Sequence, residues 1–287
     1  MINREDLKKY LTKSVIMRID YMPLTDNLVD EMNLNVSNKL LEEYEFTKTF
    51  EGSINSVDIQ VNNAEILENQ NFLNINNYTR IKSYEIIRLI EDEVYIKVVI
   101  NKHFTCVEIN EELQYMKYEE YEKIFDILIN EIYANSINIK RIGFRKINDF
   151  LIRKTDDTIF EYLNDEFFKY DYKFLKDSEE EDIIDLIMER KYSMRKNIKE
   201  INIITHISQG TLNEKEQVKR AAMDIDISIN DFNTLREIRN SKRILQNIKE
   251  INDTIFKIFI NMFSPKFIDE LKKKDENELF IGVNLNE

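Results

Sequence analysis

Three consecutive segments near the middle of the chain, residues 84–90, 94–100 and 103–109, consist mostly of hydrophobic residues, many of them β-branched or aromatic. Two short polar stretches separate these segments. Short runs of this composition are typical of strands, and such short connections join antiparallel neighbours. The pattern therefore predicts a meander of three antiparallel strands.

Two other segments have a helical period instead. Between residues 111 and 135 the hydrophobic positions recur every three or four residues, and charged residues occupy much of the opposite face. The same pattern begins again at Ser241 and continues almost to Pro265, which is typical of the residue that follows a helix. Each pattern predicts a long amphipathic helix with one face turned toward a sheet.

Further extended segments are predicted ahead of these helices. They lie at residues 14–22, 39–50, 54–61, 138–149, 191–208 and 217–229. Strands followed by a covering helix, twice in one chain, predict an α+β protein whose antiparallel sheets are each covered by a long amphipathic helix. A pseudo-duplication of this strands-then-helix unit would explain the shared plan, and so would a chance likeness between two α+β halves.

The predicted organisation has three parts within one compact unit. The first α+β half spans residues 1–155, an acidic and aromatic connector spans residues 156–190, and the second α+β half spans residues 191–287. Within the connector, residues 156–182 carry eleven acidic side chains against three lysines. This stretch is either a solvated connection or a docking surface for a basic partner, for instance one that otherwise binds nucleic-acid phosphates.

Composition narrows the classes of function. The chain has 287 residues, 43% of them hydrophobic, which is enough to bury a substantial core. With 54 acidic and 41 basic residues its formal net charge is −13. A protein that binds nucleic acid without regard to sequence needs a field that attracts phosphates, so direct nucleic-acid binding is not expected.

The few histidine and cysteine residues do not form a recognisable catalytic or metal-binding set. Cys106 is the single cysteine, so no disulfide can form within the chain, and a reduced cytoplasmic location is expected. No stretch has the composition of a signal peptide or a membrane helix. His103 and Cys106 are three residues apart in a predicted strand, which places them on opposite faces, and His206 is distant in sequence.

The strongest candidate for function is a pair of oppositely charged strands. Within RIGFRKIND, residues 141–149, strand alternation places Arg141, Gly143 and Arg145 on one face. Within AAMDIDISI, residues 221–229, it places Asp224 and Asp226 on one face. If the strands are neighbours, the guanidinium groups can form structural ion pairs with the carboxylates, and Gly143 leaves room for a guanidinium to lie flat.

Two other interpretations of these residues remain open. Asp224 and Asp226 are suited to hold Mg²⁺ or Mn²⁺ for chemistry on nucleotides or nucleic acid, although the sequence has no glycine-rich phosphate loop. Alternatively, Arg141 and Arg145 are suited to bind a nucleotide or small anion without turnover. Asn148 would then be a neighbouring polar group, but strand alternation places it on the opposite face unless the strand bulges or ends there.

The same two motifs resemble those of a known family. RIGFRKIND is similar to an R-x-G-x-R-x-x-N strand, and AAMDIDISI is similar to a later L-D-x-D strand that a long helix follows. These motifs mark an uncharacterised, sporadically distributed bacterial and archaeal family of about this length, whose members begin with a hydrophobic strand similar to SVIMRIDYM. This chain departs from the pattern at Met223, where leucine is usual, and in its long acidic connector. The resemblance implies no activity or cofactor, but it implies a patchily inherited gene with mobile or defence-associated neighbours.

These observations favour a non-catalytic cytoplasmic binding protein. We expect it to have a protein partner, with a basic one favoured by the acidic chain, and to be the partner, neutraliser or sensor in a bacterial defence or toxin–antitoxin-like module. The divalent-metal enzyme that uses Asp224 and Asp226 is the first alternative. The anion sensor that uses Arg141, Arg145 and Asn148 is the second.

Overall fold

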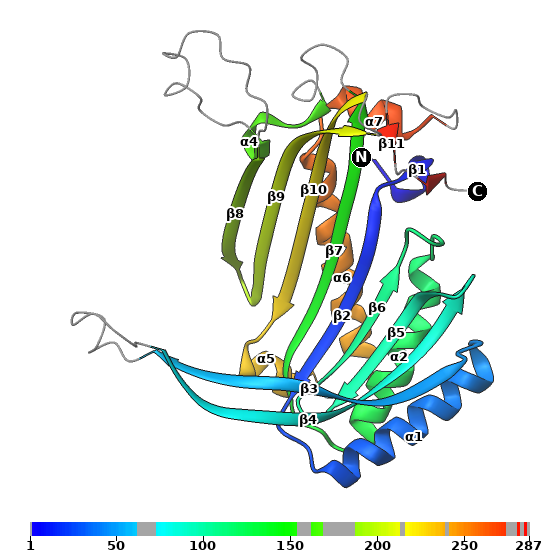
Figure 1. Ribbon diagram of the computed structural model, residues 1–287, viewed down its shortest axis with the longest axis vertical. Helices are drawn as coiled ribbons and strands as arrows, with labels where there is room; N and C mark the ends of the chain where they lie inside the picture. Colours follow the sequence, from blue (N-terminus) through cyan, green and yellow to red (C-terminus); the bar gives the residue numbers. More distant parts are fainter. Residues whose placement is uncertain are drawn as a thin grey trace.

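One antiparallel sheet forms the framework of the protein (Figure 1). A computed structural model describes residues 2–61, 73–153, 162–168, 187–212, 216–238, 241–273, 280–281 and 284–285. In these residues nine strands pair in the order β3-β4-β5-β6-β2-β7-β10-β9-β8. Their bounds are β2 Thr12–Tyr21, β3 Lys48–Val61, β4 Leu73–Ile90, β5 Glu93–Asn101, β6 Phe104–Asn110, β7 Ile139–Arg153, β8 Ile187–Lys196, β9 Lys199–Leu212 and β10 Glu216–Ile229.

The long helices lie on one face of this sheet. Figure 1 shows α2 (Tyr118–Ala134) and α6 (Ser241–Asn261) behind the strands, where they contact each other. The helix α1 (Asp26–Glu43) packs beside α2 and against β4 and β5. The remaining short elements are η1 Arg4–Asp6, β1 Lys9–Tyr10, α4 Asp165–Phe168, α5 Phe232–Glu237, α7 Pro265–Leu271, β11 Phe280–Ile281 and β12 Asn284–Leu285; β11 pairs with β7 and β12 with β1.

Strand alternation explains why the helices cover only this face. In β2 the side chains of Val15, Met17 and Ile19 are fully buried, whereas their neighbours are at least partly accessible. The same alternation continues in β10, where every second residue from Ala221 to Ile229 is buried. The buried side chains of both halves of the chain belong to one hydrophobic cluster between the sheet and the helices.

The α+β class is confirmed, but the expectation of separate sheets is corrected. The strands β2 and β7 pair antiparallel at the centre, with Met17 opposite Phe144, and thereby join the two groups of strands edge to edge. An exposed edge with unpaired backbone groups at either position would be open to aggregation, and this pairing removes it.

The topology of the two strand groups is alike. In the first, β2 pairs with β6, and β5, β4 and β3 follow outward in reverse chain order. In the second, β7 pairs with β10, and β9 and β8 follow in the same manner. A long covering helix comes after each group, α2 after the first and α6 after the second.

Most predicted strands are present, and the errors lie at helices and at one hairpin. The extended segment predicted at residues 191–208 is the antiparallel pair β8 and β9, with a turn at residues 197–198. The meander at residues 84–109 is formed by β4, β5 and β6. The prediction of an extended segment at residues 39–50 is wrong over its first part, because residues 39–43 complete α1. The helix predicted from residue 111 begins only at Tyr118, and Pro265 occupies the first turn of α7 rather than ending the structure.

The predicted acidic connector lies largely outside the described residues. Its described parts are residues 162–168 and residues 187–190, and the latter belong to β8 rather than to a connection. In the former, Tyr162, Leu163 and Phe168 are buried. The backbone N–H of Ser264 donates a hydrogen bond to the carbonyl oxygen of Tyr162. Aromatic residues in this segment therefore contribute to the core at the start of α7.

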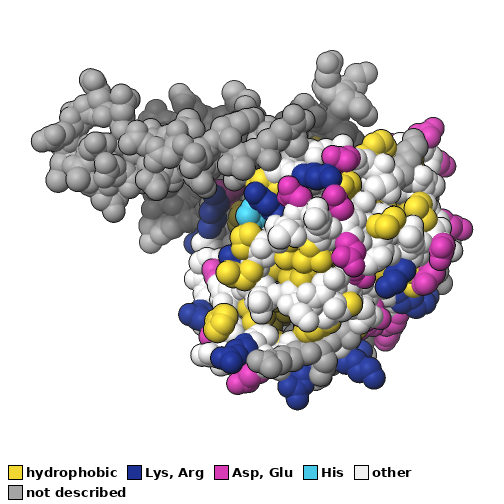
Figure 2. All heavy atoms as spheres, turned by 90° about the horizontal axis from the view of Figure 1, so that it is seen from below, with side chains coloured by type: hydrophobic (Ala, Val, Ile, Leu, Met, Phe, Trp, Pro, Cys, Tyr) yellow, Lys and Arg dark blue, Asp and Glu magenta, His cyan; other side chains and the backbone are white. Residues whose placement is uncertain are grey.

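The described surface mixes both signs of charge. Figure 2 shows, at the end of the molecule that lies lowest in Figure 1, acidic and basic side chains interspersed around a central group of hydrophobic ones. Among the described helices, none is long and apolar enough to cross a membrane.

Candidate functional site

The predicted charged residues lie on the sheet face opposite the helices. Arg141 and Arg145 project from β7, and Asp224 and Asp226 project from the adjacent strand β10. The two strands pair antiparallel, with Asp226 directly opposite Arg145. The structure therefore brings together the four charged residues that the sequence singles out.

Each arginine bonds an aspartate diagonally across the strand pair. Arg145 Nε donates to Asp224 Oδ1 at 2.7 Å, and Arg145 Nη2 forms a second hydrogen bond with Asp224 Oδ2. Arg141 Nη2 donates to both carboxylate oxygens of Asp226, at 3.1 Å and 3.4 Å. These two-oxygen contacts fix the orientation of both carboxylates.

Gly143 makes the position of Arg141 possible. A Cβ atom at residue 143 would lie 2.8 Å from Arg141 Nη1 and 2.9 Å from Arg141 Cζ and Nη2. The guanidinium group of Arg141 therefore lies directly over the glycine. Any larger residue at this position would displace it.

The ion pairs continue beyond the predicted residues. Arg141 Nη1 also contacts Asp20 Oδ2 at 3.5 Å, and Asp20 accepts a hydrogen bond from Arg18 Nε at 2.8 Å. At the other end of β7, Asp149 accepts hydrogen bonds from the guanidinium of Arg220. We call this set the charge ladder: Arg18, Asp20, Arg141, Arg145, Asp149, Arg220, Asp224 and Asp226.

The arginines of the charge ladder are the outer members. The Arg145 side chain is 42% exposed and its partner Asp224 is 20% exposed. The hydrogen bond to Asp224 raises the pKa of Arg145, and burial raises the pKa of Asp226. Because a guanidinium engages both oxygens of each aspartate, a metal ion at Asp224 or Asp226 would compete with an arginine for the same carboxylate oxygens. No three His, Cys, Asp or Glu side chains are grouped as metal ligands within the part of the chain that the structure describes.

Asn148 lies on the other face of β7, as strand alternation indicates. Its Oδ1 accepts a hydrogen bond from Thr12 Oγ1 at 3.0 Å, and the side chain lines a pocket beneath α6. Arg141, Arg145 and Asn148 therefore do not form one binding site. The two arginines and the asparagine belong to separate faces of the sheet.

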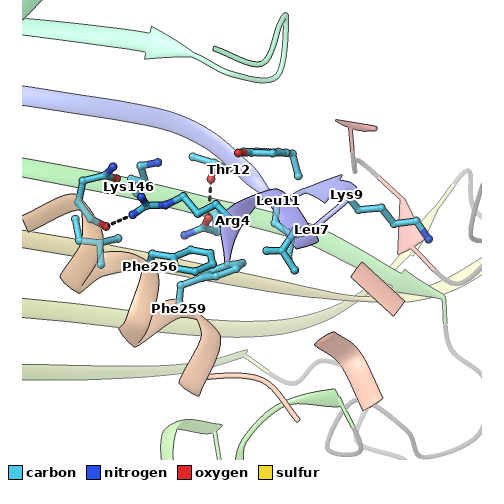
Figure 3. A pocket seen from close by; sticks show the side chains of 12 residues that line it. Arg4, Leu7, Lys9, Leu11, Thr12, Lys146, Phe256 and Phe259 are labelled. Carbon is cyan, nitrogen blue, oxygen red and sulfur yellow. Dashed lines mark hydrogen bonds between the residues drawn. The ribbon is translucent and has the colours of Figure 1, made fainter. Parts of the chain in front are cut away.

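The pocket beside Asn148 has basic and apolar walls. We call it the polar pocket and define its polar members as Arg4, Thr12, Lys146, Asn148 and Asn252. Figure 3 shows Arg4, Thr12 and Lys146 grouped between β2, β7 and α6, with Phe256 and Phe259 below them. Lys9 also borders the space, but its side chain points away from Arg4 and Lys146 (Figure 3).

A buried ionisable pair lies next to the polar pocket. Burial raises the pKa of Glu111 to about 7, and the nearby ammonium of Lys146 and the N–H of Met116 counteract this shift. Burial lowers the pKa of Lys146, and Glu111 counteracts it. Lys146 Nζ also lies 3.4 Å from the hydroxyl of Tyr121.

The histidines and the cysteine are not assembled into a site. Cys106 lies on β6, opposite Arg18 of β2, and burial raises the pKa of its thiol to about 12. Burial and the nearby Lys102 lower the pKa of His103, which lies in the turn before β6. His206 lies on β9, which β7 and β10 separate from β2.

The sequence motifs miss the outer parts of the charge ladder and the polar pocket. Arg18 and Asp20 are two residues apart in a predicted strand and therefore share a face, as Arg141 and Arg145 do. Strand alternation could thus have identified this charged pair in the first strand. Lys146 and Asn252 carry no such signal, because each is a single polar residue within an apolar strand or helix face. Compared with models of known protein families and with curated proteins, this chain matches none.

Proposed function

We propose that this protein is a non-catalytic binding protein and that a protein partner docks on the charge ladder. The observation that supports this most is the engagement of Asp224 by Arg145 and of Asp226 by Arg141. Residues with these contacts are preorganised to present guanidinium groups in fixed positions. Arginine is also enriched at protein interfaces, where its planar group donates several hydrogen bonds.

The charge ladder suits specific recognition more than simple attraction. Its four arginines and four aspartates balance, whereas the whole chain has a formal net charge of −13. Long-range attraction then comes from the acidic protein as a whole, which favours a basic partner. The ordered pairs on the docking face select among such partners by hydrogen-bond geometry.

The two alternative functions require these pairs to open. A metal-dependent reaction at Asp224 and Asp226 needs carboxylate oxygens that are free to bind Mg²⁺ or Mn²⁺. An anion sensor at Arg141 and Arg145 needs guanidinium groups that release Asp226 and Asp224. Both alternatives therefore cost the free energy of the pairs, and the binding protein does not.

The proposed setting is cytoplasmic, in a bacterial defence or toxin–antitoxin-like module. It rests on the resemblance of RIGFRKIND and AAMDIDISI to the two strand motifs, and on the single cysteine. We also infer that the two halves of the chain arose by duplication. The matching order of strands in each group, with its first strand paired to its last, supports this inference.

The proposal is tested by affinity capture from the native host with a charge-exchange variant. In this variant Arg145→Asp is combined with Asp224→Arg, which keeps one opposite-charge pair but reverses its direction. The control exchanges Asp269→Lys and Lys272→Asp, an exposed pair on α7. We expect the wild type and the control to retain the same stoichiometric protein, and the ladder variant to lose at least about tenfold of it.

Two results would contradict the proposal. One is a partner that the ladder variant retains as well as the wild type does. The other is a partner-free wild type that hydrolyses nucleotides or nucleic acid with Mg²⁺ or Mn²⁺ and loses this activity in Asp224→Asn.

A further inference from the structure

The polar pocket contains buried hydrogen-bonding groups that have no partner among the described residues. Both atoms of the Asn252 carboxamide, Nδ2 and Oδ1, are in this state, and so is Asn148 Nδ2. Asn252 is 1% exposed and Asn148 is 2% exposed. A buried polar atom without a partner costs about 1 to 3 kcal/mol, so two such amides at one place require an explanation.

The unpartnered groups face one shared space. Asn148 reaches it from β7 and Asn252 reaches it from α6. The space offers about 40 Å³ to the centres of water-sized molecules, and it adjoins a wider groove that also borders on Arg4, Tyr10 and Phe256. A small molecule can therefore enter from the groove and place its polar end against the two amides.

The charge of the walls indicates the sign of the ligand. Arg4 and Lys146 both line the polar pocket, whereas none of its described lining residues is acidic. This contrasts with the acidic character of the whole chain. The nearest acidic groups lie behind the wall: Glu111 acts electrostatically on Lys146, and Asp253 is held by Arg4 Nη1 at 2.8 Å.

The hydrogen-bond inventory points to an acceptor-rich group. The two carboxamides offer N–H donors from both sides, and Lys146 contributes an ammonium group. The carboxamide acceptors are fewer, because Asn148 Oδ1 already accepts from Thr12, which leaves Asn252 Oδ1. Arg4 already donates to the main-chain carbonyl of Asn252 and to Asp253. Leu11, Ile255 and Phe256 form apolar walls beside these groups.

We propose that the polar pocket binds the carboxylate group of a small molecule with an apolar body. The carboxylate accepts hydrogen bonds from Asn148, Asn252 and Lys146, and the apolar body contacts the walls formed by Leu11, Ile255 and Phe256. A single negative charge matches one ammonium group that Glu111 already balances in part. A phosphate dianion would leave excess negative charge in an enclosed space. This site lies on the helix-covered face and is independent of the charge ladder.

The same chemistry is available from two sources, a free organic acid and the carboxyl terminus of a peptide. Isothermal titration calorimetry on the full chain distinguishes them. The probes are butyrate, hexanoate and phenylacetate, their neutral amides, inorganic phosphate, and a tripeptide ending in leucine with a free or an amidated terminus. We expect saturable binding of hexanoate or phenylacetate and a loss of at least about tenfold for the matching amide.

Two variants connect this binding to the pocket. Asn252→Leu removes the unpartnered carboxamide, and Lys146→Met removes the ammonium group but keeps most of the side-chain volume. Each is expected to weaken carboxylate binding at least about tenfold. Asn247→Leu is the matched control, because Asn247 is on the same helix and its amide bonds only the exposed Arg243 carbonyl among the contacts described. Circular dichroism checks that every variant is folded.

The relative affinities of these probes distinguish the two sources of the carboxylate. A free-acid ligand is indicated if hexanoate binds at least as tightly as the tripeptide, and a peptide terminus if the free tripeptide binds more tightly than both hexanoate and its amidated form. The proposal is overturned if no carboxylate binds saturably, if phosphate binds more tightly than every carboxylate, or if Asn252→Leu and Lys146→Met both bind like the Asn247→Leu control.

Discussion

Replacing Gly143 with alanine tests whether the glycine between the two arginines is there to make room for Arg141. The new Cβ would lie 2.8 Å from Arg141 Nη1, which is closer than side chains tolerate. The obstructing atoms are the end of a flexible side chain, so the guanidinium moves and the backbone stays. This movement separates Arg141 from Asp226 and from Asp20.

Two opposing effects set the size of the change. Alanine is favoured over glycine in a strand by about 0.5 to 1 kcal/mol, and nothing in the backbone of Gly143 opposes this, because its φ angle lies outside the left-handed region. The displaced pairs are 20% to 29% exposed, and together they contribute about 1 kcal/mol at such partly exposed positions. Gly143→Ala alone should therefore change the free energy of unfolding very little.

A double-mutant cycle with Arg141→Ala separates the contribution of the Arg141 ion pairs from the preference of the strand for alanine. Without the arginine side chain the new Cβ has space, so Gly143→Ala should stabilise the Arg141→Ala protein by about 0.5 to 1 kcal/mol. The difference between the two backgrounds, about 1 kcal/mol, is measured by urea denaturation of the four proteins. Equal stabilisation by Gly143→Ala in both backgrounds would refute the packing of Arg141 over the glycine.

Three further predictions concern the buried residues. Burial raises the pKa of Glu111 from 4.5 to about 7, so between these pH values the folded state binds more protons than the unfolded state. The free energy of unfolding should therefore fall as the pH rises from 5 to 7.5, and Glu111→Gln should make this fall smaller. The same pH dependence of the free energy of unfolding in the wild type and in Glu111→Gln would contradict it. Burial raises the pKa of Cys106 to about 12, so its thiol should react with iodoacetamide at pH 8 far more slowly in the native protein than in urea. Mass spectrometry measures the two rates of alkylation, and equal rates would contradict the burial of this thiol. Phe267 is fully buried and stacks on Phe263 with ring centroids 4.3 Å apart, so Phe267→Ala should cost about 3 to 5 kcal/mol in urea denaturation, and a cost below about 1 kcal/mol would contradict its place in the core.

The fold could be predicted where the local pattern of hydrophobic residues is strong. The hydrophobic runs at residues 84–109 and the helical period from Ser241 are both clear in the sequence, and the structure contains the meander and the helix. The helix α1 is not predicted, although Val36 and Leu40 continue its buried stripe from Val29 and Met32. Polar residues such as Asn33 and Asn35 between those positions weaken the helical signal.

The joining of the strands into one sheet depends on contacts that a linear pattern does not contain. Met17 and Phe144 are opposite each other although more than a hundred residues separate them in the chain. Either strand could equally have been an edge on the evidence of its own residues. Only the pairing of β2 with β7 makes the sheet continuous.

One part of the candidate site could be predicted from the sequence and the other part could not. The opposite charges of RIGFRKIND and AAMDIDISI are visible in the sequence, and alternation alone places them on matching faces. The polar pocket was not predictable, because Lys146, Asn148 and Asn252 meet only after β7 and α6 pack together. Asn148 is an example: strand alternation predicts which face of the sheet it lies on, but not which residues of α6 lie beside it.

If Arg145 and Asp224 act as an opposite-charge pair in the framework, exchanging their charges should restore the stability that either single substitution removes. Arg145→Asp and Asp224→Arg alone each place two like charges together, so each should lower the free energy of unfolding by about 1 to 3 kcal/mol. The combined variant should recover to within about 1 kcal/mol of the wild type in urea denaturation. A combined loss equal to the sum of the single losses would contradict it.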